Sequence, residues 1–512
     1  MDWDLFLSYV ILVLYIGGIM AIAAYYRNKA KTLDQFYLAG RGLGPWMTAF
    51  SYGATYFSAV IFIGYAGNLG WRFGTAAIWI GIGNGLIGAL LAWKVLAKRT
   101  RNITRRLDVK TMPSYFEKRY DGKYLKLIAC LIIFVFLIPY SASVYNGLGY
   151  MFSKTFKMNY TVCVLILAAI TALYVFFGGY LASALSDFVQ GIIMLVGIAI
   201  MVVFVLASKE VSWFSGFKEL SDRTLGIIPS GSLSNKFYDN NFFTLLMLVC
   251  LTSFGVWALP QIIHRYYVIK HESTIKRGMV ISTVFSLIIG GGAYLVGSFG
   301  RLFFDAKPSN IDTIVPDLLA KSAMPGVFMG FIAVLLFAAS MGTLAALALS
   351  SASTVSMDLY KGYIKKDASE KQVKILLRVL SLVFIFLSAI LAIGQVDTIV
   401  TLMGLSWGTV AGCFIGPFVL GLFFKHITKA AAYCSLIGGV VFTFAMTIII
   451  GGDALGWSGG LWQIIKKGVT YSPMIGVFTM VFSIIITLVV SLFTKRPGDD
   501  VLHEAFSKEV PE

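Results

Sequence analysis

Apolar segments of about 20 residues recur along the whole chain, and each is long enough to cross a hydrocarbon core about 30 Å thick as a helix. Of the 512 residues, 58% are hydrophobic and only 13% are charged, whereas ordinary soluble domains carry about 25% charged residues. A transmembrane barrel would instead show alternating segments of about ten residues. The sequence therefore predicts an all-α polytopic membrane protein.

About thirteen segments meet this length criterion. They are residues 5–25, 45–67, 76–96, 125–150, 159–180, 185–207, 241–263, 278–300, 325–355, 375–394, 398–423, 429–451 and 473–493. The first segment is too long for a signal peptide and lacks its cleavage pattern, so we expect it in the mature protein. We predict a single transmembrane transporter domain over residues 1–493 and a short cytoplasmic tail over residues 494–512.

Basic residues are concentrated in alternate loops, which accounts for the formal net charge of +17 without a nucleic-acid partner. Loops rich in Lys and Arg stay in the cytoplasm. The residues that mark these loops are Arg27, Lys29, Lys31, Arg41, Lys94, Lys98, Arg99, Arg101, Arg105, Arg106, Lys110, Arg265, Lys270, Lys276, Arg277, Lys361, Lys365, Lys366, Lys371, Lys374, Lys495 and Arg496. This pattern predicts that the N-terminus lies outside the cell and the C-terminus inside.

The segments divide into two groups of opposite orientation. The second to sixth segments span residues 45–207, and the seventh to eleventh span residues 241–423. An offset of five helices is odd, so corresponding helices cross the membrane in opposite directions. Inverted repeats of this kind are typical of secondary transporters, in which the first helix of each repeat is interrupted near the midplane and carries the binding sites.

Both of these first helices contain residues that weaken a helix. Gly53 lies among hydroxyl and aromatic side chains, and Gly255 is followed by Pro260, which lacks a backbone donor. The alternative explanation is that the glycines serve only close helix packing. If the helices are interrupted, the candidate solute-binding residues at the breaks are Thr55, Tyr56, Ser58, Ser253, Val256, Trp257 and Pro260.

Asp187 is the one carboxylate that lies clearly within an apolar segment. A lone acid in hydrocarbon costs about 2.5–3.5 kcal/mol, so it requires a partner or an aqueous path. We expect Asp187 to take part in ion coupling; the alternative is a purely structural acid near the cytoplasmic interface. The ninth segment is rich in small and hydroxyl residues, and Thr343 would supply an oxygen to a hard cation such as sodium.

Three motifs together resemble the sodium/solute symporter family. They are residues 36–46, residues 178–190, which run from a Gly-Gly pair through Asp187, and the ninth segment with its ending at residues 357–361. The likeness covers about residues 5–493. It implies a leucine-transporter-type fold of two inverted five-helix repeats with extra helices at the ends, and secondary active symport driven by sodium.

The resemblance also implies a sodium site formed by backbone carbonyls and by two hydroxyl side chains. The corresponding positions in this chain are Ala54, Phe57, Ala339, Gly342 and Thr343. Gly342 lacks the expected hydroxyl, so a serine at this position is expected to tighten sodium binding. A second sodium site of some members requires hydroxyls where this chain has Ala345 and Ala346. We therefore expect at most one sodium ion per transport cycle.

Two branches of the family compete as models for the transported solute. The pattern over residues 54–64 looks most like pantothenate and monocarboxylate symporters. Tyr140 and Pro260 match the proline branch, but Thr252 and Val256 replace aromatic residues of that branch.

The sequence as a whole predicts a multi-pass symporter of the plasma membrane. It would import a small organic solute that bears a carboxylate, namely pantothenate, a monocarboxylate or an amino acid such as proline, by alternating access. We expect no enzymatic activity, no cofactor and no metal other than Na+ as the coupling ion, because nucleotide-loop and metal-site motifs are lacking. The alternatives are a proton-coupled symporter of the same solutes, a passive facilitator or channel, and a transporter-like sensor.

Overall fold

The computed structural model describes residues 3–27, 32–223, 229, 231, 236–322 and 324–507. Over these residues the fold is helical, apart from one isolated β-bridge between Leu43 and Ile269. The side chain of Arg27, the residues Lys29 and Lys31 and the end of the predicted tail, residues 508–512, lie outside the described part.

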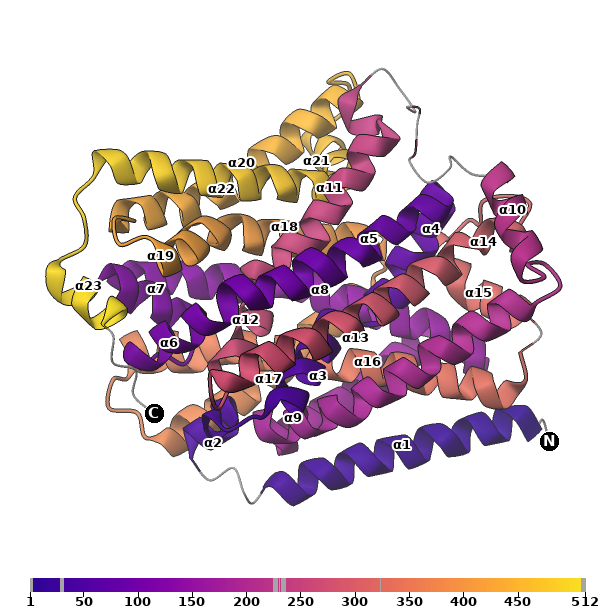
Figure 1. The fold of residues 1–512 in the computed structure, drawn as a ribbon, viewed down its shortest axis with the longest axis horizontal. Coiled ribbons are helices and arrows are strands. Elements are labelled where there is room, and N and C mark those ends of the chain that lie inside the picture. Colours follow the sequence, from indigo (N-terminus) through magenta and orange to yellow (C-terminus); the bar gives the residue numbers. More distant parts are fainter. Residues whose placement is uncertain are drawn as a thin grey trace.

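Long helices lie side by side in a bundle, with short helices at its two ends (Figure 1). The long helices and the halves of interrupted ones are α1 (Trp3–Arg27), α3 (Pro45–Tyr56), α4 (Ala66–Phe73), α5 (Ile78–Gly83), α8 (Lys123–Phe156), α9 (Tyr160–Ala207), α11 (Asn241–Phe254), α12 (Pro260–Tyr267), α13 (Ser273–Ser298), α16 (Gly326–Ser353), α17 (Glu370–Ile393), α18 (Ile399–Ile415), α20 (Lys429–Ala454) and α22 (Ser472–Phe493). The remaining α-helices are α2 (Leu33–Leu38), α6 (Lys98–Arg106), α7 (Met112–Tyr120), α10 (Phe214–Arg223), α14 (Gly300–Phe303), α15 (Ile314–Lys321), α19 (Gly421–Phe423), α21 (Leu461–Val469) and α23 (Asp499–Phe506).

Helix α16 forms the centre of the bundle. Every residue from 332 to 354 is buried, whereas α1 lies along one edge and α20 and α22 lie along the opposite one (Figure 1). A helix surrounded by protein on all sides can carry hydroxyl groups at little cost, because neighbouring helices supply their hydrogen-bond partners. The small-residue ninth segment of the sequence is therefore the internal axis of the molecule.

The structure does not confirm the predicted count of thirteen membrane-crossing helices. Over the described residues, eleven helices are long and apolar enough to cross a membrane, or twelve if the bent pair α11 and α12 counts as one. The difference lies in residues 45–96. The predicted second segment is interrupted, its first half is only the 12-residue α3, and its second half joins the third segment in one helical run, residues 60–106.

Helix α13 shows how this long run is arranged. A Cβ atom on Gly70 would lie 2.2 Å from the backbone of Gly297, and one on Gly81 would lie 2.7 Å from that of Gly290. Phe57 packs against Phe285, which lies near the middle of α13 and closer to its start than Gly290 and Gly297 do. The chain thus advances along α13 from residue 57 and returns along it from residue 70. Gly74, with φ of 57°, lies in the reversal.

Helix α9 contains two predicted segments and folds back on itself. Its first residue, Tyr160, donates a hydrogen bond to the carbonyl of Ala392 at the end of α17 (3.0 Å). Near its other end, Phe204 packs against Phe328 at the start of α16, with ring centroids 4.8 Å apart. These two positions lie at the same end of the bundle, because α16 and α17 are consecutive antiparallel helices. The middle of α9, with Asp187, is thereby brought toward the opposite half of the molecule.

Both predicted helix interruptions are present. Helix α3 ends at Tyr56, and Phe57 adopts an extended conformation (φ −105°, ψ 120°) before the helix resumes. Helices α11 and α12 are bent by 42° at their junction, where Leu259 is extended (φ −81°, ψ 120°) directly before Pro260. Proline cannot donate a backbone hydrogen bond, so the second break follows from its covalent structure.

Candidate cation and solute site

Two hydroxyl groups of α16 satisfy backbone groups that the break in α3 leaves unpaired. The Ala59 amide donates to the hydroxyl of Ser340 (3.0 Å). The Thr343 hydroxyl donates to the carbonyl of Ala54 (3.0 Å) and lies 3.4 Å from that of Ala339. Three oxygen atoms of the predicted sodium set, from Ala54, Ala339 and Thr343, are therefore clustered beside the break.

The space beside Gly342 contains a carboxylate. A Cβ atom added to Gly342 would lie 2.6 Å from Oδ1 of Asp187, 3.2 Å from Oε1 of Gln190 and 3.4 Å from Cβ of Ala54. Oxygens of two α9 side chains, Asp187 and Gln190, thus occupy the space where a hydroxyl of residue 342 would lie. Hard cations prefer such oxygens as ligands, and a carboxylate adds a full negative charge that a hydroxyl lacks.

Asp187 is held deep inside the protein by side chains rather than by backbone donors. The Ser51 hydroxyl donates to its Oδ2 (2.5 Å), and Nη1 of Arg265 lies 3.3 Å from the same oxygen, with both side chains fully buried. Its Oδ1 has no hydrogen-bond partner among the described residues. The carboxylate thus turns one satisfied oxygen toward α12 and one unpaired oxygen toward Gly342.

Arg265 is a functional candidate that the sequence analysis assigned wrongly to a cytoplasmic loop. The structure places it on α12, directly after the second break, where it pairs with Asp187 and also donates to the Thr55 hydroxyl. Its guanidinium lies over the ring of Tyr180, 4.8 Å from the ring centroid. The signal was available, because an acid buried in a membrane requires a cation partner and Arg265 follows Pro260 by little more than one helical turn.

Aromatic side chains gather next to the break in α3. Tyr56 donates to the carbonyl of Thr252 (2.6 Å), which ties the two interrupted helices together. Its ring stacks on that of Trp407 at an interplanar angle of 30°, with centroids 6.1 Å apart, and Tyr140 meets Trp407 edge-on at 5.6 Å. Trp407, on α18, was missed because nothing in its own segment distinguishes it from a packing residue.

Two predicted solute-binding residues are already engaged elsewhere. The Thr55 hydroxyl donates to Ser51 of its own helix (2.8 Å) and accepts from Arg265. The Trp257 indole donates to the carbonyl of Ile87 (3.2 Å), on the helix run that follows the first interrupted helix. These two side chains support the breaks, and the structure does not bring them together with the Tyr56, Tyr140 and Trp407 rings.

The remaining candidates are buried at the two breaks. The Ser58 hydroxyl accepts from the Val60 amide (3.3 Å) where the helix resumes. The Ser253 hydroxyl is buried and has no hydrogen-bond partner among the described residues, so it retains a donor for a bound molecule. Val256 and Pro260 are buried without polar side-chain atoms. The second break thus contributes mainly apolar surface and one hydroxyl.

The arrangement of two interrupted helices around a cluster of oxygens agrees with a comparison of the whole sequence. The model of the sodium:solute symporter family matches residues 36–439. The chain belongs to this family. Membership confirms the resemblance inferred from the motifs and identifies the protein as a multi-pass membrane transporter.

Curated relatives within the family are similar over nearly the full length. The chain is 30% identical to a sodium/proline symporter of Haemophilus influenzae, over 97% of this chain and 96% of the relative. It is 29% identical to sodium/proline symporter 2 of Staphylococcus saprophyticus, over 97% and 95%, and 27% identical to an osmoregulated proline transporter of Bacillus subtilis, over 95% and 94%. These relatives fall in the branch that the motifs ranked second.

Solved structures confirm the fold. The structure of a Na+-coupled sialic acid symporter aligns with a TM-score of 0.76 at 18% identity, over 96% of this chain and 99% of that one. A nucleobase-cation-symport-1 family transporter, Mhp1, in a closed conformation aligns with a TM-score of 0.51 at 12% identity, over 92% and 97%. The predicted leucine-transporter-type fold of this symporter is therefore confirmed.

Proposed function

We propose that this symporter couples the inward movement of one Na+ to the uptake of proline or a closely similar zwitterionic amino acid. The observation that carries the proposal is the unpaired Oδ1 of Asp187 beside Gly342, next to the oxygens of Thr343 and Ala54. The proline part of the proposal rests on the curated relatives, which are proline transporters.

The sodium ion would lie between the break in α3 and the centre of α16. Carbonyl oxygens of Ala54, Phe57 and Ala339, the Thr343 hydroxyl and Oδ1 of Asp187 would be its ligands. The Thr343 hydroxyl would then give up its hydrogen bond to the Ala54 carbonyl, and both oxygens would coordinate the sodium ion. The ion would also provide a partner for the unpaired Oδ1 of Asp187. An unpaired charged oxygen in a buried site is costly, so this ligand set gives the cation a large share of its binding free energy.

The solute would bind next to the ion, against Tyr56, Tyr140 and Trp407. An apolar pyrrolidine ring fits a site that is bounded by aromatic faces and by the apolar surface at Val256 and Pro260. In this scheme Ser58 and the exposed backbone of the two breaks orient the charged end of the zwitterion.

We further propose that residues 45–207 and 241–423 form the two inverted repeats and that the basic loops face the cytoplasm. Sodium binding would fix the α3 break against α16 and order the adjacent backbone for the solute. Each ligand then raises the affinity of the other, as reciprocity of coupling requires. Movement of one helix group against the other would expose both ligands to the cytoplasm.

The test is uptake of labelled proline into proteoliposomes with an inward sodium gradient, a proton gradient or neither. Pantothenate, lactate and acetate serve as comparison solutes. Proline accumulation only with the sodium gradient is the expected result. Accumulation driven by protons alone would assign coupling to Asp187 as a proton carrier, equal uptake under all conditions would indicate a facilitator, and a preference for pantothenate or lactate would overturn the proposed solute.

Replacing Thr343 with valine removes one sodium ligand while keeping the shape of the side chain. One such polar contact is worth about 1 kcal/mol, so the sodium concentration for half-maximal proline uptake should rise roughly fivefold to tenfold. The matched control is Thr354→Val, about three turns further along the same helix run, because the Thr354 hydroxyl is also buried and donates to the carbonyl of Ser351 (2.8 Å). An equal shift in both variants would argue against a ligand role for Thr343.

A further inference from the structure

A small basic groove opens at the end of the bundle that carries α6 and α23. Its volume is about 260 Å³, and its lining includes Lys98, Arg99, Asn102, Arg106, Leu422 and Phe506. Among the described residues that line it, three are cations and none is an acid. The transport scheme above uses none of these side chains.

The cations of the basic groove are only partly neutralised. Glu272 lies just outside the groove, where Lys98 meets its carboxylate at 2.7 Å and Asn102 donates to it at 2.6 Å. Arg99 instead stacks on the ring of Phe423, 4.2 Å from its centroid, and reaches the carbonyl of Leu422 at 3.5 Å. Among the described residues, Lys98 and Arg99 therefore have one carboxylate between them, that of Glu272.

The helical run of residues 60–106, which contributes Lys98 to the groove, also carries exposed apolar side chains. Leu86 and Leu91 are exposed by 45% and 38%, and Lys94 and Lys98 follow one and two turns later on an exposed face. Residues spaced three to four apart share one face of a helix. This face thus changes from apolar to basic within a few turns, as at the boundary between acyl chains and headgroups.

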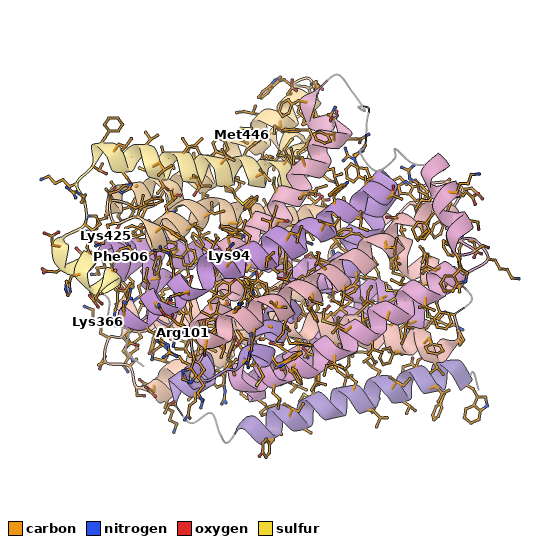
Figure 2. The ribbon with its side chains drawn as sticks, viewed as in Figure 1. Lys94, Arg101, Lys366, Lys425, Met446 and Phe506 are labelled. Atoms are coloured by element: carbon orange, nitrogen blue, oxygen red, sulfur yellow. The ribbon has the colours of Figure 1, made fainter. Side chains whose placement is uncertain are left out.

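Helix α23 lies at the same end of the bundle as α6 and α7 (Figure 1), and its residue Phe506 lines the basic groove. Arg106 donates to the carbonyl of Ala505 (3.2 Å), and the Ala505 side chain is fully buried. Phe506 lies beside Lys425 at this end of the molecule (Figure 2), with the ammonium 5.7 Å from the ring centroid.

We propose that the basic groove binds the phosphodiester headgroup of an anionic phospholipid, with an acyl chain lying along Leu91 and Leu86. Phosphate oxygens would accept hydrogen bonds from Arg99 and Lys98. The negative phosphate would thereby neutralise positive charge that Glu272 alone does not neutralise. Under the proposed orientation, the lipid belongs to the cytoplasmic leaflet. The exposed leucines beside the cations favour a lipid over a soluble phosphate, because a soluble phosphate has no acyl chain to pack against Leu91 and Leu86.

The test is equilibrium binding of fluorescent phosphatidylglycerol to the full-length protein in detergent, with the same label on phosphatidylcholine as reference. The test variant is Lys98→Gln/Arg99→Gln, because both side chains are exposed and their loss leaves no buried charge. Each basic residue near an anionic headgroup contributes about fivefold, so the double variant should bind phosphatidylglycerol roughly thirtyfold more weakly, with phosphatidylcholine binding unchanged.

The matched control is Lys366→Gln/Lys371→Gln, which removes the same charge from exposed residues in the connection between α16 and α17 and at the start of α17. Equal weakening in the test and control variants would mean that net charge attracts the lipid, and it would overturn the groove as the site. Displacement of the lipid by millimolar inorganic phosphate would assign the groove to soluble anions instead. This binding measurement does not depend on uptake, so its failure is distinguishable from failure of the proposed transport function.

Discussion

Asp187→Asn is expected to raise the sodium concentration for half-maximal proline uptake roughly tenfold to a hundredfold, because a polar contact with a charged group contributes about 1.5–3 kcal/mol. The substitution removes the one charged oxygen that faces Gly342 and leaves Arg265 without its carboxylate. The measurement is proline uptake into proteoliposomes over a range of sodium concentrations. The Ser51 hydroxyl also loses the acceptor that it contacts at 2.5 Å.

A double variant separates the role of Asp187 in folding from its role in sodium binding. Asp187→Asn/Arg265→Gln removes both charges, so most of the folding cost of an unpaired arginine should disappear, which thermal unfolding in detergent would detect. Its sodium affinity should stay low, because the ligand is still absent. An unchanged half-maximal sodium concentration in the single variant would confine Asp187 to a structural role.

Gly342→Ser is expected to weaken sodium-dependent uptake roughly tenfold, since forcing extra atoms into a packed interior costs about 1–3 kcal/mol. The sequence alone led to the opposite expectation, that the added hydroxyl would restore a ligand. In the structure, the new Cβ would lie 2.6 Å from Oδ1 of Asp187. That carboxylate is fixed by Ser51 and Arg265, so it has little freedom to move aside.

Two further variants sharpen this prediction. Gly342→Ala adds the same Cβ without a hydroxyl and should be impaired to a similar degree if displacement of Asp187 is the cause. Gly291→Ala is the control, because no atom lies within 4 Å of the position that a Cβ on Gly291 would take. Tighter sodium binding in Gly342→Ser would show that the hydroxyl acts as a ligand and that Asp187 makes way for it.

The sequence predicted the features that depend on local chemistry. Apolar length predicted most of the spans, and Pro260 together with the glycine and hydroxyl pattern predicted both interruptions. The count of thirteen was not confirmed. The sequence shows residues 45–67 and 76–96 as two apolar segments, whereas in the structure the first is interrupted at Phe57 and its second half continues into the other segment. Local patterns cannot reveal where a chain reverses against a distant helix such as α13.

The features that were missed depend on contacts between distant segments. Arg265 appeared to be one more loop cation, and only the path of α9 through the bundle shows that it faces Asp187. The same contact explains Gly342, because a glycine at this position makes room for a side chain from a helix about 150 residues earlier. Trp407 had no distinguishing neighbours along the chain, and it gained significance only through Tyr56 and Tyr140.

The buried pair of Arg265 and Asp187 has a consequence for the electrical behaviour of transport. The two side chains cancel, so the pair itself carries no net charge, and under the proposed function one Na+ and a zwitterion would add a single positive charge to it. A potential of 100 mV acts on one charge with about 2.3 kcal/mol. If one Na+ enters with a zwitterion as proposed, the membrane voltage would drive the loaded carrier inward and would have little effect on the return of the unloaded pair.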